Sequence, residues 1–195
     1  MTSILVIRHG QSDWNEAGLI QGRTDRPLSA AGRDEVRKWK LPDAWAGAPC
    51  ICSPLRRARE TARLLGLDPH PEPRLTEMAW GDWEGQSLPA LRREFGAAMT
   101  DNEARGLDFH PPGGESPRDV QMRLTPLLAE IEARTVLVTH KGVLRALYAL
   151  ATGWTMKRKP PQRLLDGCAH ALVLAADGTP SVVELNIPLK PEPAS

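Results

Sequence analysis

The chain has 195 residues, 41% of them hydrophobic, which suits one domain with a sizeable core. Its 25 lysines and arginines nearly balance 24 aspartates and glutamates, so the net charge of +1 does not indicate a nucleic-acid or anionic-membrane partner. The three cysteines form neither a disulfide framework nor the spacing of a zinc site. No signal peptide or membrane-length apolar run is present, and we expect a soluble, cytoplasmic protein.

Apolar strands and amphipathic helices alternate along the sequence. Residues 4–7, 49–52 and 135–139 are apolar runs typical of strands buried on both faces. Residues 169–176 and 181–185 predict a closing hairpin, followed by a loose tail from Ile187. Helices are expected after the cap Ser116 and over residues 30–39, 55–65, 88–99 and 143–151. Loops or extended segments are expected over residues 9–28, 69–73, 75–85 and 100–114.

This alternation predicts an α/β fold, a three-layer α/β/α sandwich with a mostly parallel central sheet and helices on both faces. In such sheets ligands bind beyond the carboxyl ends of the strands. His9 and His140 each come just after a buried strand, and Ser53 follows a third, ahead of Arg57. We therefore expect two histidines and the arginines Arg8 and Arg57 at one rim of the sheet.

These residue types together indicate phosphoryl transfer. Arg8 and Arg57 carry permanent charge on planar donor groups that match a phosphate. Positive neighbours lower the pKa of a histidine, so His9 would be a neutral nucleophile able to attack phosphorus. The arginines and His140 would stabilise the developing charge, and water would hydrolyse the phosphohistidine. Glu77 is the candidate proton donor for the leaving alkoxide.

Taken one at a time, such residues can also have purely structural roles. An Arg-His-Gly tripeptide is weak support by itself, and a histidine at a strand end is more often structural than catalytic. We expect structural roles for the remaining three histidines, His70, His110 and His170. A solvent-exposed helix face is expected for Arg56, Arg59 and Arg63. For His9 and His140 a structural role is less favoured, because both occupy equivalent positions on separate strands.

Several motifs in order resemble the histidine phosphatase superfamily, the phosphoglycerate mutase-like proteins. RHGQSDWN at residues 8–15 is similar to the signature of that family, and QGRTDRPLSAAG follows at residues 21–32. SPLRRARETA, LTEMAWGDWEG, PPGGES and VLVTHKGVLRAL complete the set. The motifs cover nearly the whole chain, so the resemblance implies the phosphoglycerate mutase-like fold. Gln11 is a mild departure, because many members have glutamate there.

The resemblance implies roles for individual residues. His9 matches the nucleophile that becomes phosphorylated, and Glu77 matches the proton donor. The residues expected to bind the phosphate are Arg8, Asn15, Gln21, Gly22, Arg57 and His140, of which Arg8, Arg57 and His140 are also expected to take part in catalysis. The resemblance implies no metal, and we expect no cofactor.

Phosphatases and mutases share this family, so activity has to be argued from the site. The glycolytic mutases are longer and carry a lysine and paired arginines in an inserted segment. Here Leu88 and Pro89 lie near the expected position of the lysine, although Arg92 and Arg93 are present. We therefore predict a phosphatase, with phosphoglycerate mutase activity and a non-catalytic phosphate-binding module as alternatives.

A lid is predicted within a single domain spanning residues 1–195. The segment over about residues 78–112 includes Trp83, Phe95 and Phe109, and it favours a small phosphorylated metabolite over a protein substrate. Core packing is the competing interpretation of these aromatic residues. Motif for motif, the chain most resembles the α-ribazole phosphatase and broad-specificity phosphatase branch. A homodimer is possible.

Overall fold

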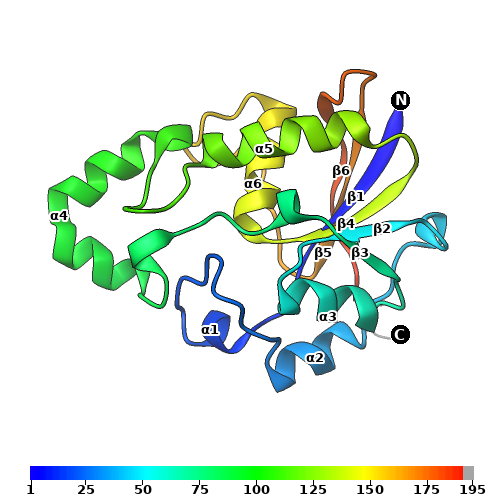
Figure 1. The fold of residues 1–195 in the computed structure, drawn as a ribbon, viewed down its shortest axis with the longest axis horizontal. Helices are drawn as coiled ribbons and strands as arrows, with labels where there is room; N and C mark the ends of the chain where they lie inside the picture. The colour runs from blue at the N-terminus through cyan, green and yellow to red at the C-terminus, as the bar shows by residue number, and fades with distance from the viewer. Residues whose placement is uncertain (191–195) are drawn as a thin grey trace.

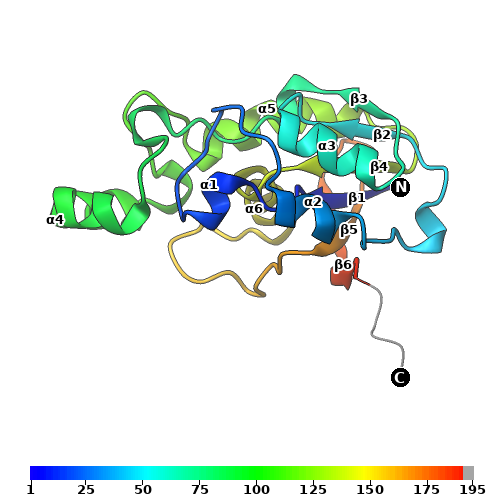
Figure 2. The same ribbon diagram turned by 90° about the horizontal axis from the view of Figure 1, so that it is seen from below.

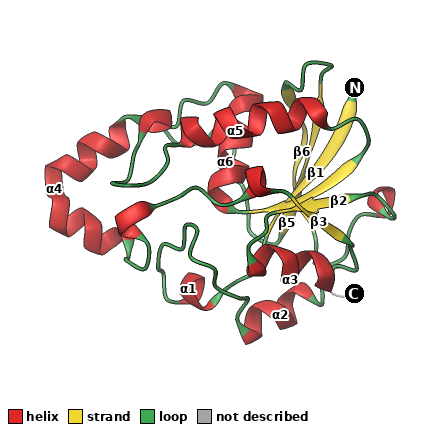
Figure 3. Ribbon diagram, in the orientation of Figure 1, coloured by secondary structure: helices red, strands yellow, loops and turns green. Residues whose placement is uncertain are grey.

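The computed structural model describes residues 1–190, so the end of the predicted loose tail lies outside the described residues. Six strands form one sheet in the order β3-β2-β4-β1-β5-β6 (Figure 3). The strands are β1 (Thr2–Arg8), β2 (Cys50–Cys52), β3 (Pro69–Pro71), β4 (Thr135–Thr139), β5 (Cys168–Leu174) and β6 (Pro180–Pro188). The first four strands run parallel to one another, whereas β5 is antiparallel to both β1 and β6. The α/β prediction with a mostly parallel sheet is therefore confirmed.

Helices cover both faces of the sheet (Figures 1 and 2). They are α1 (Asp13–Glu16), α2 (Ala30–Val36), α3 (Arg56–Leu64), α4 (Leu88–Ala104), α5 (Pro117–Glu130) and α6 (Lys141–Thr152). Helices α5 and α6 contribute to the apolar core on one face, and α2 and α3 contribute to the core on the other. Among the described residues, no helix is long and apolar enough to cross a membrane.

Strand β1 shows how the sequence produces these layers. Ile4 and Val6 pack in the core beneath α5 and α6, while Leu5 and Ile7 pack in the opposite core. All four side chains are completely buried, as expected for a strand whose successive residues point to opposite faces of a covered sheet. The strand is thus fixed on both faces, and its carboxyl end is a rigid support for the residues that follow.

Some local predictions were confirmed and others were wrong. Helix α4 continues to Ala104 instead of ending at residue 99, because residues 100–104 are polar but contain no helix-breaking glycine or proline. Gly96, at φ +49°, makes a kink between its two helical segments. The segment over residues 9–28, expected to be a loop with partial structure, contains the short helix α1. Residues 69–71 are extended, as predicted, and pair with β2 as β3. The first residues of the predicted loose tail are ordered, since β6 runs to Pro188 and Leu189 is buried.

Helix α4 extends to one side of the sandwich (Figure 1). Trp83, Leu91 and Met99 form a small apolar cluster of their own, with Trp80 and Phe109 packed against it. Core packing therefore accounts for part of the aromatic content of residues 78–112. The action of this segment as a lid stays a prediction.

Candidate active site

His9 follows β1 directly and is only 6% exposed. Its Nδ1 lies 2.6 Å from the carbonyl oxygen of Gly10, and its Nε2 lies 3.3 Å from Nε of Arg57. A carbonyl only accepts and a guanidinium only donates, so Nδ1 carries the proton and Nε2 presents a lone pair. Burial, followed by the charges of Arg8 and Arg57, holds the pKa of His9 well below its usual value. The imidazole is therefore neutral at physiological pH.

His140 lies beside His9, with the ring centroids 5.0 Å apart in an edge-to-face arrangement. It follows β4, the parallel neighbour of β1, which explains why the two strand ends meet. Its Nε2 lies 2.7 Å from Oγ of Ser53, a residue that follows β2. Burial, with Arg57 as the largest electrostatic contribution, lowers the pKa of His140 well below its usual value. The three strand ends therefore converge as predicted.

Arg57 is completely buried near the start of α3. Its Nη1 and Nη2 donate to the carbonyl oxygens of Thr24 and Gly22, at 2.9 and 2.7 Å. Thr61 fixes the same region, because its hydroxyl accepts from the Gly10 amide and donates to the Arg57 carbonyl. The guanidinium is thus held rigidly beside His9 by groups that bear no compensating charge.

Arg8, the last residue of β1, lines the same cavity as His9. It forms an ion pair with Asp166, which precedes β5. Nε of Arg8 is buried and has no hydrogen-bond partner among the described residues. A planar guanidinium with an unused donor at the wall of a cavity is suited to bind an oxyanion.

Glu77 is 8% exposed and reaches the amino-terminal end of α6. Its Oε1 accepts from the Met78 amide at 2.8 Å, and its Oε2 accepts from the Gly142 amide at 3.2 Å. A Cβ on residue 142 would lie 2.4 Å from Oε1, so a side chain there would displace the carboxyl group. Gly142 is required for this close approach.

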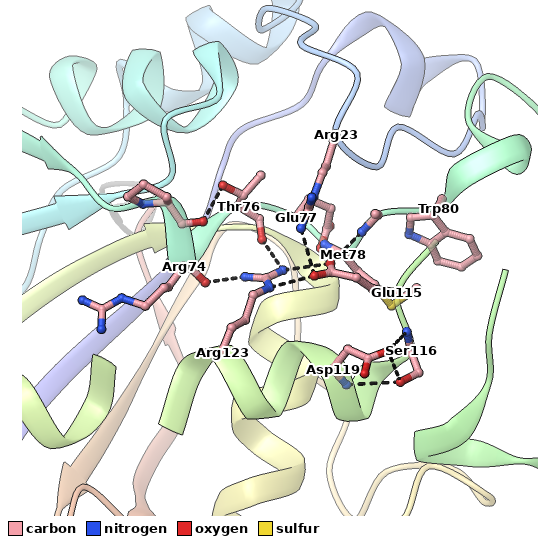
Figure 4. A network of polar contacts seen from close by, with 12 residues as sticks. Arg23, Arg74, Thr76, Glu77, Met78, Trp80, Glu115, Ser116, Asp119 and Arg123 are labelled. Atoms are coloured by element: carbon pink, nitrogen blue, oxygen red, sulfur yellow. Dashed lines mark hydrogen bonds and ion pairs between the residues drawn. The ribbon is translucent and has the colours of Figure 1, made fainter. Parts of the chain in front are cut away.

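A polar network holds the segment that carries Glu77 (Figure 4). Arg123, on α5, donates to the carbonyl oxygens of Arg74 and Thr76, and its Nε lies 3.2 Å from Oε1 of Glu115. The other oxygen of Glu115 accepts from the Ala79 amide at 2.9 Å. The backbone is therefore fixed on both sides of Glu77. Sequence reasoning missed this network, whose members lie up to 49 residues apart.

The other residues expected at the phosphate also line the cavity. Oδ1 of Asn15 accepts from the backbone amide and the hydroxyl of Ser12 in a capping box. The side-chain nitrogen Nδ2 of Asn15 is then available to a ligand. Gln21 donates to the Ser12 hydroxyl, and its Oε1 is buried without a partner among the described residues. Gly22 contributes its carbonyl to Arg57.

The cavity has a volume of about 580 Å³ and is lined by every predicted site residue except His140. His140 is completely buried behind the cavity wall, with its ring beside that of His9. A second cavity of about 360 Å³ adjoins it, and the two share Trp80, Leu88, Gly142 and Arg145 in their walls. The main cavity also contains charged residues that the sequence analysis did not assign, namely Glu35, Lys141, Arg145 and Asp166. Lys141 and Arg145 belong to the VLVTHKGVLRAL motif, and only this position could have suggested them.

The remaining candidates lie elsewhere. His110 is on the surface near Asp119, and His70 lies on β3 and is exposed. His170 is buried on β5, where its Nδ1 accepts from the Asn186 amide. Burial lowers the pKa of His170 to about 4. Neither cavity includes any of these histidines, in agreement with structural roles.

The protonation state of His9 can be tested directly. Because burial and two neighbouring cations lower its pKa, we expect His9 to stay neutral from pH 8 through pH 6.5 and to gain a proton only well below that pH. The ¹⁵N shifts of its ring, followed by NMR in the free protein, measure this. A midpoint near 6.5 for His9 would contradict a neutral nucleophile at this position.

The chain is similar to known proteins over nearly its whole length. The sequence matches the Histidine phosphatase superfamily (branch 1) over residues 4–188. A 2,3-bisphosphoglycerate-dependent phosphoglycerate mutase from Methylorubrum extorquens (strain PA1) is 32% identical, over 92% of this chain and 93% of the relative.

Two solved structures have the same fold. The crystal structure of phosphoglycerate mutase from Thermus thermophilus is 32% identical, with a TM-score of 0.75 over 95% of this chain and 98% of that one. A protein named mycobacterial hydrolase 1 is 25% identical, with a TM-score of 0.77 over 96% of this chain and 100% of that one. From its motifs and its fold, the chain belongs to the histidine phosphatase superfamily, branch 1.

Proposed function

We propose that this protein is a metal-independent phosphomonoesterase that acts on a small organic phosphate through a phosphohistidine at His9. The observation that carries the proposal is the presentation of the neutral Nε2 of His9 to a cavity that Arg8 and Arg57 also line. A neutral imidazole whose unprotonated nitrogen lies beside two guanidinium groups suits attack on a phosphate.

The proposed reaction has two steps. In the first, Nε2 of His9 forms a bond to phosphorus while the bond to the ester oxygen breaks, and Glu77 gives a proton to the departing alkoxide. Arg8, Arg57 and His140 stabilise the charge on the phosphoryl oxygens. In the second, water attacks phosphorus, the bond to Nε2 breaks, Glu77 regains a proton from that water, and inorganic phosphate is released.

The size of the cavity supports a small-molecule substrate. About 580 Å³ is within the range of pockets that hold metabolites, and Trp80 and Leu88 offer apolar surface beside the charged groups. We propose that residues 78–112, which supply both side chains, act as a lid over the bound ester. Membership of the α-ribazole phosphatase branch stays a prediction.

Phosphoglycerate mutase activity is the second candidate, favoured by the names of relatives that are 32% identical. The chain spans 93% of the length of the Methylorubrum relative. Chain length, part of the sequence argument for a phosphatase, therefore does not separate this protein from relatives named as mutases. Both candidates share the phosphohistidine and differ in whether water or a second metabolite accepts the phosphoryl group.

Phosphate release from a panel of phosphorylated metabolites and p-nitrophenyl phosphate tests the proposal. We expect turnover between pH 5 and 8 that is unchanged by a chelator. Loss of activity with the chelator would contradict the metal-independent mechanism, and no turnover of any ester would favour a phosphate-binding module. Interconversion of phosphoglycerates well above the rate of hydrolysis would show that the mutase reaction is the main one.

A further inference from the structure

Two cations in the main cavity have no role in the proposed chemistry. Lys141 and Arg145 lie four residues apart on α6 and both line the cavity wall. Within residues 1–190, neither side chain has a hydrogen-bond or ion-pair partner. Arg8, in the same cavity, differs from them because it pairs with Asp166. The two cations are therefore available to a ligand.

Their arrangement is unfavourable in the free protein. Like charges four residues apart on a helix repel each other. The surrounding protein also withdraws both groups from water, which lowers the pKa of Lys141 and of Arg145. Arg145 is held in place by the indole ring of Trp154, with its guanidinium carbon 5.1 Å from the ring centroid. A bound anion would reduce the repulsion between Lys141 and Arg145.

The position of the pair relative to the phosphate site is set by α6. Lys141 comes directly after His140, and Arg145 follows five residues after it. At a rise of 1.5 Å per residue, Arg145 lies about 7.5 Å further along the helix axis than His140. Arg145 also lines the second cavity, so it is located where the two spaces join.

We infer that the cavity takes phosphomonoesters that carry a second anionic group, a carboxylate or another phosphate, and that Lys141 and Arg145 bind this group. The inference rests on the proposed function, since it places the ester phosphate between Arg8 and Arg57. The second anion is separated from that phosphate by a few atoms, so that it lies further along α6.

Other arginines nearby fit this role less well. Arg92 lines only the second cavity, and its Nη2 is 2.7 Å from a carboxylate oxygen of Glu103. Arg93 lines neither cavity. The adjacent arginines of α4 are therefore paired or directed elsewhere.

Matched substrates test the inference. 3-Phospho-D-glycerate and sn-glycerol 1-phosphate have the same configuration and differ only in a carboxylate against a hydroxymethyl group. Fructose 1,6-bisphosphate and fructose 6-phosphate test a second phosphate in the same way. For at least one pair we expect kcat/KM to be about tenfold higher for the ester with the extra anion, as for a charge-assisted hydrogen bond.

Lys141→Met and Arg145→Met should each lower the ratio of kcat/KM between the two esters of a pair by about fivefold, mainly through KM for the ester with the extra anion. The kcat/KM for the ester without that anion should stay nearly unchanged.

Lys141→Arg and Arg145→Lys should restore most of the preference, because they keep the charge. Arg63→Met, an exposed arginine on α3 outside both cavities, is the matched control and should keep the full ratio. No preference in either pair, or a preference that both methionine variants retain, would overturn the inference. Equal losses on charged and neutral esters would also overturn it.

Binding gives the same comparison without turnover. Calorimetry of the matched esters with the His9→Ala protein should show tighter binding of the charged member, and Arg145→Met in that background should remove the difference. A protein that binds the charged ester selectively and turns over no ester would contradict the proposed function alone. Turnover of esters without any preference would contradict this inference alone.

Discussion

His9→Asn is expected to abolish the phosphoenzyme and to lower kcat by about 10⁴-fold or more, the scale seen when a nucleophile is removed. The amide of asparagine can still donate to the Gly10 carbonyl, which now accepts from Nδ1 of His9. The substitution thus removes the lone pair of Nε2 while it leaves the local contact in place. Incubation with a ³²P-labelled ester, followed by an alkaline quench that preserves phosphohistidine, measures the covalent intermediate.

His110→Asn is the matched control, because it makes the same chemical change at an exposed histidine outside both cavities. We expect it to retain full labelling and turnover. Labelling of the His9→Asn variant would show that another residue is the nucleophile. His140 would be the first position to examine, because its ring centroid lies 5.0 Å from that of His9. Thermal unfolding of both variants shows whether loss of labelling reflects loss of the fold.

The convergence of His9, His140 and Ser53 could be predicted because it depends on a general property of parallel sheets. Each residue follows an apolar strand, and neighbouring parallel strands present their carboxyl ends at one edge. The position of Arg57 could be predicted in the same way, because Arg57 lies near the start of the helix that follows β2. For these residues, local sequence and strand direction are enough to bring the groups together.

Contacts between distant segments were beyond the sequence. Arg8 and Asp166 are 158 residues apart, and no local pattern links them. Lys141 and Arg145 are part of the VLVTHKGVLRAL motif. The sequence could not show that both lack a partner within residues 1–190, because this depends on every element packed around α6. The true end of α4 was missed because residues 100–104 are polar and were assigned to the loop that follows, although they contain no glycine or proline to end a helix.

The proton donor can be examined through the dependence of rate on the leaving group. If Glu77 protonates the departing oxygen, Glu77→Gln should lower kcat/KM for an alkyl phosphate by about 10²- to 10⁴-fold. It should affect p-nitrophenyl phosphate much less, because nitrophenolate departs without a proton. Arg123→Met should give the same selective loss, at about tenfold or more, since Arg123 fixes the carbonyl oxygens of Arg74 and Thr76 just before Glu77.

Selectivity for the leaving group separates positioning from simple damage to the fold. A general loosening of the cavity would slow both esters together, because both need the same phosphate site. Arg118→Met makes the same change on α5 at an exposed arginine that pairs with Asp108, and it should leave both rates unchanged. Equal losses for the alkyl and aryl esters in Arg123→Met would show that the arginine only supports the fold. A selective loss would mean that α5, through Arg123 and Glu115, holds the donor in the geometry that proton transfer requires.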